Sequence, residues 1–345
     1  MERLPRYRTG DPELDDHVAA LVREAGAMAH GDLVFELIST ALRLGRENDA
    51  RLDLKIANAA LKEMRYAFQV FSSYRGTRKV SIFGSARTRA EDPHYRLARE
   101  FARAVAARDW MVLTGAGPGI MTAGIEGAGA KHSFGINIRL PFEALPSEYI
   151  ADDPKLINFR YFFTRKLIFM KESHGFVLLP GGYGTLDEAF ELLTLVQTGK
   201  SEPTPIVLLQ APGEQYWNAW MRFVEDELLA GEMIAAEDLA LVRITSDIEE
   251  AVDEITGFYS NYDSARFVRG LLILRVKHLP DDAMFGTLNE SFGDIVVKGR
   301  IEPVEPSDVE VAGNDRLDLA RVGLRFDRTH WARLRQLIDV LNGRG

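Results

Sequence analysis

Residues 180–188 read Pro180-Gly181-Gly182-Tyr183-Gly184-Thr185-Leu186-Asp187-Glu188, and they stand between an apolar run at 176–179 and a run of helical period at 186–197. The order strand, glycine turn, helix is typical of sites where backbone N–H groups and a helix N-terminus cradle a phosphate. Glu188 falls about one turn into the expected helix, within reach of whatever carries that phosphate. The first hypothesis is therefore a nucleotide held by its phosphate, with a carboxylate beside its sugar.

The same alternation of strand and helix extends from about residue 79 to residue 262. Short apolar runs of strand character are separated by amphipathic stretches of helical period. The runs are 80–83, 110–113, 134–138, 176–179, 206–209 and 241–244, and the helical stretches include 95–107, 159–171 and 216–229. This pattern predicts parallel βαβ units in a Rossmann-like, doubly wound α/β sheet.

Two zones of different pattern flank this region. The N-terminal zone carries apolar residues at helical spacing and little strand signal, which predicts a helical extension. In the C-terminal zone, runs at 271–276 and 294–297 predict strands, 331–341 predicts a closing helix, and 302–306 predicts a turn or short linker. We therefore predict a helical extension at 1–78, a nucleotide-binding catalytic domain at 79–262 and a small α+β appendage at 263–345.

Composition restricts the classes of function. The chain has 345 residues, 46% of them hydrophobic, and a net charge of −9, which argues against broad attraction to nucleic acid or anionic membranes. It has no cysteine, so disulfides and thiolate chemistry are excluded. No signal-peptide core, no apolar run near the ~20 residues of a membrane span and no metal-ligand spacing among the histidines is present. We expect a soluble cytoplasmic protein without a cofactor or metal.

Three glycine-rich turns follow predicted strands, at 83–87, 114–121 and 180–185. Ligands of open α/β sheets bind outside the carboxyl ends of the strands. We therefore predict that these three turns line one ligand-binding cleft. Taken singly, each turn has an ordinary structural explanation, because glycine tolerates positive φ and close packing. None continues as the Gly-Lys-Ser/Thr of a Walker loop, and residues 137–140 lack the acidic residue of a dinucleotide fingerprint. The pattern therefore favours a mononucleotide over a dinucleotide as the ligand.

Residues 180–188 resemble the Pro-Gly-Gly-x-Gly-Thr-x-x-Glu signature of the LOG-type phosphoribohydrolases, which are often mislabelled lysine decarboxylases. Arg165 and Lys166 resemble the family's catalytic arginine and its neighbour, 23 residues before Glu188 (188 − 165), and residues 115–121 match a further family segment. The resemblance covers roughly residues 79–262 and leaves both flanking zones outside. It implies hydrolysis of the N-glycosidic bond of nucleoside 5′-monophosphates, such as cytokinin ribotides or AMP, to free base and ribose 5-phosphate.

The resemblance also implies roles for particular residues and a homodimer with the site at its interface. Arg165 and Glu188 are the implied catalytic pair. The residues expected to bind substrate or phosphate are Gly84, Ser85, Gly115, Gly117, Gly119, Lys166, Gly181, Gly182, Tyr183, Gly184, Thr185 and Thr194.

Cleavage of a C1′–N bond builds positive charge on the sugar, as in other glycoside hydrolysis. An ionised carboxylate beneath the ribose can stabilise that charge and orient or deprotonate water. Arg165 cannot be an ordinary proton donor, since the pKa of arginine lies above ~12, so we expect it to act by charge and position.

Alternatives remain at this point. Thr185 and Glu188 have the spacing of a capping box, in which the glutamate would serve only the helix. Arg165 could lie on the solvated face of its own helix. At the level of function, the chain could be a general nucleotide nucleosidase, or a nucleotide- or cofactor-binding protein that catalyses nothing. Lys166 and Lys171 have no recognisable pyridoxal phosphate context, so a decarboxylase has no chemical support.

Overall fold

The computed structural model describes residues 7–26, 30–139 and 147–344. The chain divides into two compact units, Met1–Arg65 and Tyr66–Gly345. In the first unit, α1 (Pro12–Glu24) and α2 (Gly31–Glu47) pack around a small apolar core. Asp11 caps α1 by accepting hydrogen bonds from the backbone N–H groups of Glu13 and Leu14. The long helix α3 (Arg51–Ser72) contributes its last residues to the second unit.

The second unit is built on a seven-stranded sheet in the order β4-β3-β2-β1-β5-β6-β7. Every pair of neighbouring strands in it is parallel. The strands are β1 (Lys79–Phe83), β2 (Met111–Thr114), β3 (Ser133–Ile138), β4 (Leu156–Phe159), β5 (Phe176–Leu178), β6 (Ile206–Leu209) and β7 (Arg243–Thr245). The predicted Rossmann-like doubly wound sheet is confirmed.

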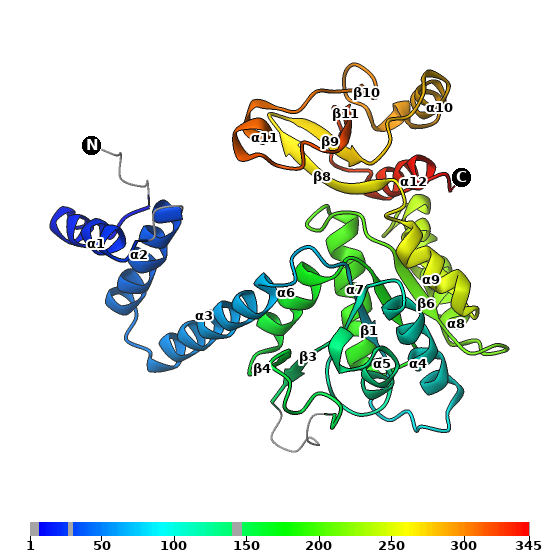
Figure 1. Cartoon of the computed structure of the whole chain (residues 1–345), viewed down its shortest axis with the longest axis horizontal. Helices are drawn as coiled ribbons and strands as arrows, with labels where there is room; N and C mark the ends of the chain where they lie inside the picture. Colours follow the sequence, from blue (N-terminus) through cyan, green and yellow to red (C-terminus); the bar gives the residue numbers. More distant parts are fainter. Residues whose placement is uncertain (1–6, 27–29, 140–146, 345) are drawn as a thin grey trace. The chain divides into compact units, whose positions relative to one another are not determined.

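Helices cover both faces of this sheet. On one face lie α4 (Pro93–Ala106) and α5 (Ile120–Ala128), side by side, with α9 (Ile248–Gly257) (Figure 1). The other face is covered by the end of α3, α6 (Phe162–Glu172), α7 (Tyr183–Gln197) and α8 (Tyr216–Phe223), which continues as a π-helix, η3 (Val224–Leu229). Alternate residues of the strands point into the two cores, so both faces of the central strands are buried.

The C-terminal part forms a second, antiparallel sheet in the order β10-β11-β9-β8. Its elements are β8 (Tyr262–Val268), β9 (Leu271–Val276), α10 (Asp282–Phe292), η5 (Gly293–Ile295), β10 (Glu302–Pro303), α11 (Asp308–Gly313), β11 (Ala320–Leu324) and α12 (Trp331–Leu341). This arrangement confirms the predicted α+β character. Ala332 of α12 belongs to the core under the seven-stranded sheet, so the closing helix also packs against that sheet's layer.

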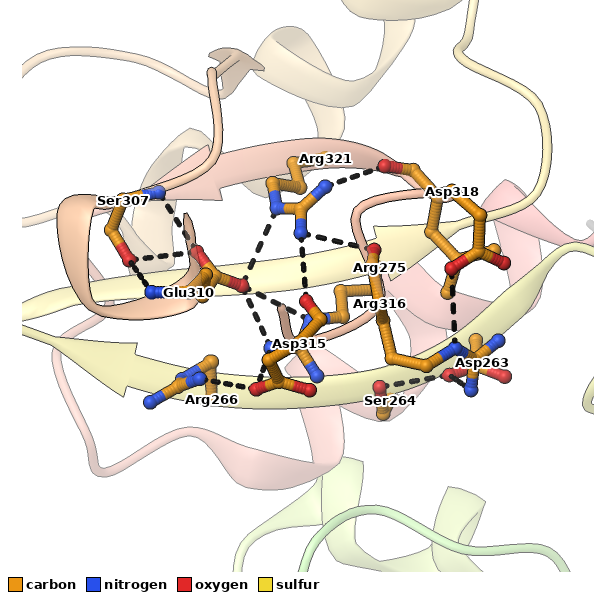
Figure 2. A network of polar contacts seen from close by, with 11 residues as sticks. Asp263, Ser264, Arg266, Arg275, Ser307, Glu310, Asp315, Arg316, Asp318 and Arg321 are labelled. Atoms are coloured by element: carbon orange, nitrogen blue, oxygen red, sulfur yellow. Dashed lines mark hydrogen bonds and ion pairs between the residues drawn. The ribbon is translucent and has the colours of Figure 1, made fainter. Parts of the chain in front are cut away.

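A buried polar network holds the second sheet to α11, as Figure 2 shows. The Glu310 carboxylate is fully buried and accepts hydrogen bonds from Arg275 at 2.7 Å and from the Ser307 N–H at 3.0 Å. Arg321 lies 3.4 Å from the same carboxylate. Two cations and a helix N-terminus therefore satisfy one buried anion.

Several predicted elements differ from the observed ones. Residues 294–297 are not a strand: Asp294 and Ile295 belong to the 3₁₀ turn η5, and of the four only Val296 forms a single bridge, with Phe326. Ile295 is fully buried in the C-terminal core, so its apolar character reflects packing, not strand pairing. The expected turn at 302–306 begins with the short edge strand β10, where a proline is tolerated. Strands β4, β8 and β11 (Ala320–Leu324) were not predicted.

Among the described residues, no helix combines the length and the apolar character needed to cross a membrane. The same residues contain no cluster of three His, Asp or Glu side chains arranged to hold a metal ion.

Candidate active site

A cleft opens where the strand order reverses. The chain leaves β1 and builds the sheet outward in one direction through β2, then returns to place β5 on the other side of β1. At the carboxyl ends of these two strands lies a cavity of about 730 Å³. It is lined by residues 83–87 and 181–188 together with Met121, Phe162 and Arg165. This is the position at which open α/β sheets bind their ligands.

The turn after β5 opens α7 directly onto the cleft. The helix begins at Tyr183, and its N-cap, Gly182, provides no side-chain hydrogen bond. The N–H groups of the first turn have no acceptor within the helix, and they carry the positive end of its dipole. Gly181 has no room for a side chain, because a Cβ there would lie 2.1 Å from Thr185 Oγ1 and 3.1 Å from Ser85 N.

The three glycine turns are tied together by backbone hydrogen bonds. The Ser85 N–H donates to the Pro180 carbonyl at 3.2 Å, and the Ile120 N–H donates to the Ser85 carbonyl at 3.1 Å. Gly119 has φ +68°, and a Cβ at that position would lie 2.3 Å from the Ser85 carbonyl oxygen. The hydroxyl of Tyr216 adds a 2.6 Å hydrogen bond to the Gly181 carbonyl. The turns therefore form one connected floor for the cleft.

Arg165 reaches the cleft from α6. Its guanidinium carbon lies 5.4 Å from the centre of the Phe169 ring and 5.9 Å from that of Phe162. The backbone at Gly115 is close enough that a Cβ there would lie 2.9 Å from Arg165 Nη2. The Gly115 turn thus makes space for the guanidinium. The alternative in which Arg165 only faces solvent is wrong, because the side chain lines the cleft.

Glu188 is the buried acid of the cleft. Its side chain is 7% exposed, and its Oε2 atom finds no hydrogen-bond partner among the described residues. Burial raises the pKa of Glu188 to about 7, although Lys166 and Arg165 oppose that shift. A carboxyl group that changes charge near neutral pH inside a cleft is typical of functional sites.

The capping-box alternative for Glu188 is contradicted by where the helix begins. Because α7 starts at Tyr183, Thr185 is already its third residue and Glu188 its sixth. A capping glutamate must stand three residues after the N-cap, and here the N-cap is Gly182. Glu188 therefore has no capping role.

The predicted binding residues fall into three groups. Gly84, Ser85 and residues 181–185 line the cleft. Gly115, Gly117 and Gly119 lie behind it, where they accommodate Arg165, Met121 and Ser85. The remaining two, Lys166 and Thr194, lie elsewhere.

Lys166 forms ion pairs with Asp187 and Glu191. Thr194 lines a separate apolar pocket of about 250 Å³, and its hydroxyl donates to the Phe190 carbonyl.

Seven other residues line the cleft that the sequence did not single out as binding residues. They are Phe83, Ala86, Arg87, Met121, Phe162, Leu186 and Asp187. Arg87 could have been found, since it ends the turn at 83–87 and brings a cation to an expected phosphate site. Phe162 and Met121 carry no chemical signal in the sequence, because apolar residues in helices ordinarily belong to a core.

Comparison with known proteins finds a family model and sequence relatives that are similar to part of this chain. Residues 119–255 match the family model described as "Possible lysine decarboxylase". A probable cytokinin riboside 5′-monophosphate phosphoribohydrolase of Oryza sativa subsp. japonica is 23% identical over 193 residues, which cover 54% of this chain and 73% of that protein. A cytokinin riboside 5′-monophosphate phosphoribohydrolase of Arabidopsis thaliana is 28% identical over 156 residues, which cover 41% of this chain and 68% of that protein.

Among solved structures, the molybdenum cofactor carrier protein of Chlamydomonas reinhardtii is 23% identical. The match covers 51% of this chain and 94% of that one, with a TM-score of 0.34. The matched range 119–255 contains Arg165 and the motif at 180–188. This part of the chain is therefore similar to the lysine decarboxylase-like family model and to cytokinin riboside 5′-monophosphate phosphoribohydrolases.

Proposed function

We propose that this protein hydrolyses the N-glycosidic bond of nucleoside 5′-monophosphates, cytokinin ribotides or AMP among them, to a free base and ribose 5-phosphate. One observation carries the proposal: in the cleft, beside Arg165 and behind a helix N-terminus, stands a buried glutamate with an oxygen that has no hydrogen-bond partner among the described residues. We propose catalytic roles for Arg165 and Glu188 on the basis of that arrangement.

The phosphate would bind the first turn of α7. Gly182, Tyr183, Gly184 and Thr185 supply N–H groups at the positive end of the helix, and Arg87 lines the same cleft. A helix rises 1.5 Å per residue, so Glu188 lies about 4.5 to 9 Å along α7 from those groups. An anion on the first turn and a sugar over Glu188 can therefore be parts of one small molecule.

Glu188 would act in its ionised form. Its carboxylate would stabilise the positive charge that develops on the ribose and would orient or deprotonate the attacking water. Arg165 would stabilise negative charge on the phosphate or on the departing base without giving up a proton. Because burial raises the pKa of Glu188 to about 7, we expect kcat/KM to rise with pH through that value.

A comparison of wild type with Glu188→Ala tests the proposal. Incubation of wild type with AMP or isopentenyladenosine monophosphate should release free base and ribose 5-phosphate in equal amounts, as followed by chromatography. The variant should lose roughly 100-fold or more of kcat, the contribution usual for acid–base groups. Absence of base release from every purine and pyrimidine monophosphate would show that the chain is not this enzyme.

Two further outcomes separate the related functions. Tight nucleotide binding without turnover would identify a binding protein of the same fold. Similar kcat/KM values for AMP, GMP, CMP and the prenylated ribotide would identify a general nucleotide nucleosidase, whereas a preference of more than tenfold would identify a specific one.

We also infer that the protein forms a homodimer or larger homo-oligomer through α6. Phe162, Phe163 and Leu167 are 52%, 55% and 46% exposed on this helix. Phe162 also lines the cleft, so a second copy on this face would adjoin the site. Contiguous exposed apolar side chains of this kind are typical of protein–protein contacts.

A further inference from the structure

Lys166 joins the two helices that carry the proposed catalytic residues. It follows Arg165 on α6, and its Nζ atom lies 2.6 Å from Asp187 Oδ2 and 2.7 Å from Glu191 Oε2 on α7. These two carboxylates stand on either side of Glu188 in the sequence of α7. The Lys166 side chain is only 13% exposed, whereas its partners Asp187 and Glu191 are 61% and 37% exposed, so the ammonium end of the double ion pair is the shielded one.

This geometry leaves Lys166 poorly placed to bind a substrate phosphate. An ammonium group has three donors, and two carboxylates of the protein already lie within ion-pair distance of this one. Lys166 is not among the residues that line the cleft, whereas Arg87 and Arg165 are. In the described part of the chain, the cations that line the cleft are therefore the two arginines.

The charges around Glu188 give Lys166 a different task. From α7, Asp187 and Glu191 disfavour the charged form of Glu188 by like-charge repulsion. Burial is the largest factor that raises the pKa of Glu188, and Lys166 is the strongest of the charges that oppose it, ahead of Arg165. Four charged groups act on Glu188: Arg165 and Lys166 from α6, and Asp187 and Glu191 from α7. A further cation, Arg87, lines the same cleft.

We propose that Lys166 is a positioning residue that fastens the Arg165 helix to the Glu188 helix and keeps the Glu188 carboxyl ionised, and that it does not bind the substrate phosphate. The inference rests on the function proposed above. Without Lys166, the like charges of Asp187 and Glu191 would be opposed by Arg165 alone among the charges named above, and the buried Glu188 would hold its proton at neutral pH.

The experiment follows the titration of Glu188 directly. Protein labelled with ¹³C at the glutamate carboxyl carbons is titrated by NMR, and the Glu188 signal is assigned by its loss in Glu188→Gln. The variants are Lys166→Met, which removes the charge at similar length, Lys166→Arg, which keeps it, and the double variant Lys166→Met with Glu191→Gln. The pH profile of kcat/KM for AMP is measured on the same proteins.

In Lys166→Met we expect the midpoint of Glu188 to rise by about one pH unit or more, as for loss of a close opposite charge. Activity at pH 7 should then fall about tenfold and recover towards pH 9, with KM little changed. Lys166→Arg should have the Glu188 midpoint and pH profile of wild type. In the double variant, the Glu188 midpoint should return towards the wild-type value. An unmoved midpoint, with KM raised at every pH, would overturn the proposal in favour of phosphate binding.

Two controls keep the outcomes separate. If Lys166→Met does not fold, Glu191→Gln alone should lower the Glu188 midpoint, and an unchanged midpoint there would also overturn the proposal. If the midpoints move as expected but wild type hydrolyses no nucleotide, the charge role of Lys166 is supported and the proposed function is the part that fails.

Discussion

At the scale of single residues, Glu188 combines burial with an oxygen that has no partner in the described part of the chain. Such a group lowers stability whenever it is ionised, because burial disfavours the charged form. Its pKa is about 7 in the folded protein and near its ordinary value of 4.5 when unfolded. The folded state therefore holds this proton more tightly, and wild type loses stability as pH rises from 4.5 through 7.

Replacement of Glu188 should reverse that loss. We expect Glu188→Gln to match wild type near pH 4.5 and to exceed its free energy of unfolding at pH 8 by on the order of 3 kcal/mol, since each pKa unit corresponds to about 1.4 kcal/mol. Urea unfolding at the two pH values measures the difference. Glu100→Gln, at an exposed position of α4, is the control and should show no such dependence. Equal stability of wild type and Glu188→Gln at pH 8 would contradict the prediction.

At the scale of elements, the turn into α7 depends on close approach of backbone to backbone. Gly181→Ala would place a methyl group 2.1 Å from Thr185 Oγ1, so the start of α7 must shift. We expect a loss of about 1 to 3 kcal/mol in the free energy of unfolding, together with weaker AMP binding in calorimetry. Gly184→Ala is the matched control: nothing lies within 4 Å of its Cβ, and alanine in a helix should stabilise by roughly 0.5 to 1 kcal/mol. Equal effects of the two substitutions would show that Gly181 is not sterically restricted.

The buried network of the second sheet provides another test at this scale. Burial alone would raise the pKa of Glu310, but the Ser307 N–H and Arg275 outweigh it and lower that pKa to about 2. The stabilisation is therefore complete above pH 4.5 and lost as pH falls towards 2. We expect Glu310→Gln to lose roughly 3 kcal/mol at pH 7, because two buried guanidinium groups lose their anion.

The position of Glu310 can be checked against an exposed neighbour. Thermal unfolding should show the loss in Glu310→Gln at pH 7 and a smaller difference from wild type near pH 2, where the wild-type carboxyl is partly protonated. Glu305→Gln, an exposed position in the loop before α11, should unfold like wild type throughout. A Glu310→Gln protein as stable as wild type at pH 7 would mean that the network contributes nothing net.

At the scale of the whole molecule, the exposed face of α6 is the feature that bears on assembly. We expect the double substitution Phe163→Glu and Leu167→Glu to convert the homo-oligomer into monomers, since two charges would be buried against a second copy. Light scattering after size-exclusion chromatography measures the mass. Phe223→Glu, at a residue of α8 that is 49% exposed, is the control and should leave the mass unchanged. A wild type that is already monomeric at micromolar concentration would disprove the assembly.

The sequence alone was sufficient for the central sheet. Apolar runs of four to six residues separated by helical stretches have few packing solutions besides parallel βαβ units, and six of the seven strands were predicted in this way. The glycine turn at 180–185 and Glu188 were singled out from local pattern, and Arg165 through the family resemblance; their roles stay predictions. The domain boundaries at residues 78 and 262 stay predictions.

Tertiary structure decided the features that depend on partners distant in the sequence. Strands β4 and β8 lie at sheet edges and contain polar residues, so only the neighbouring strand defines them. Whether Glu188 capped α7 depended on where that helix begins, and its raised pKa depended on burial by several segments. Lys166 looks in the sequence like a companion of Arg165, but the facing carboxylates of α7 set its partners. Local pattern thus determined the scaffold and the candidate residues, whereas burial and neighbouring charge, which arise only on folding, determined how those residues are paired and protonated.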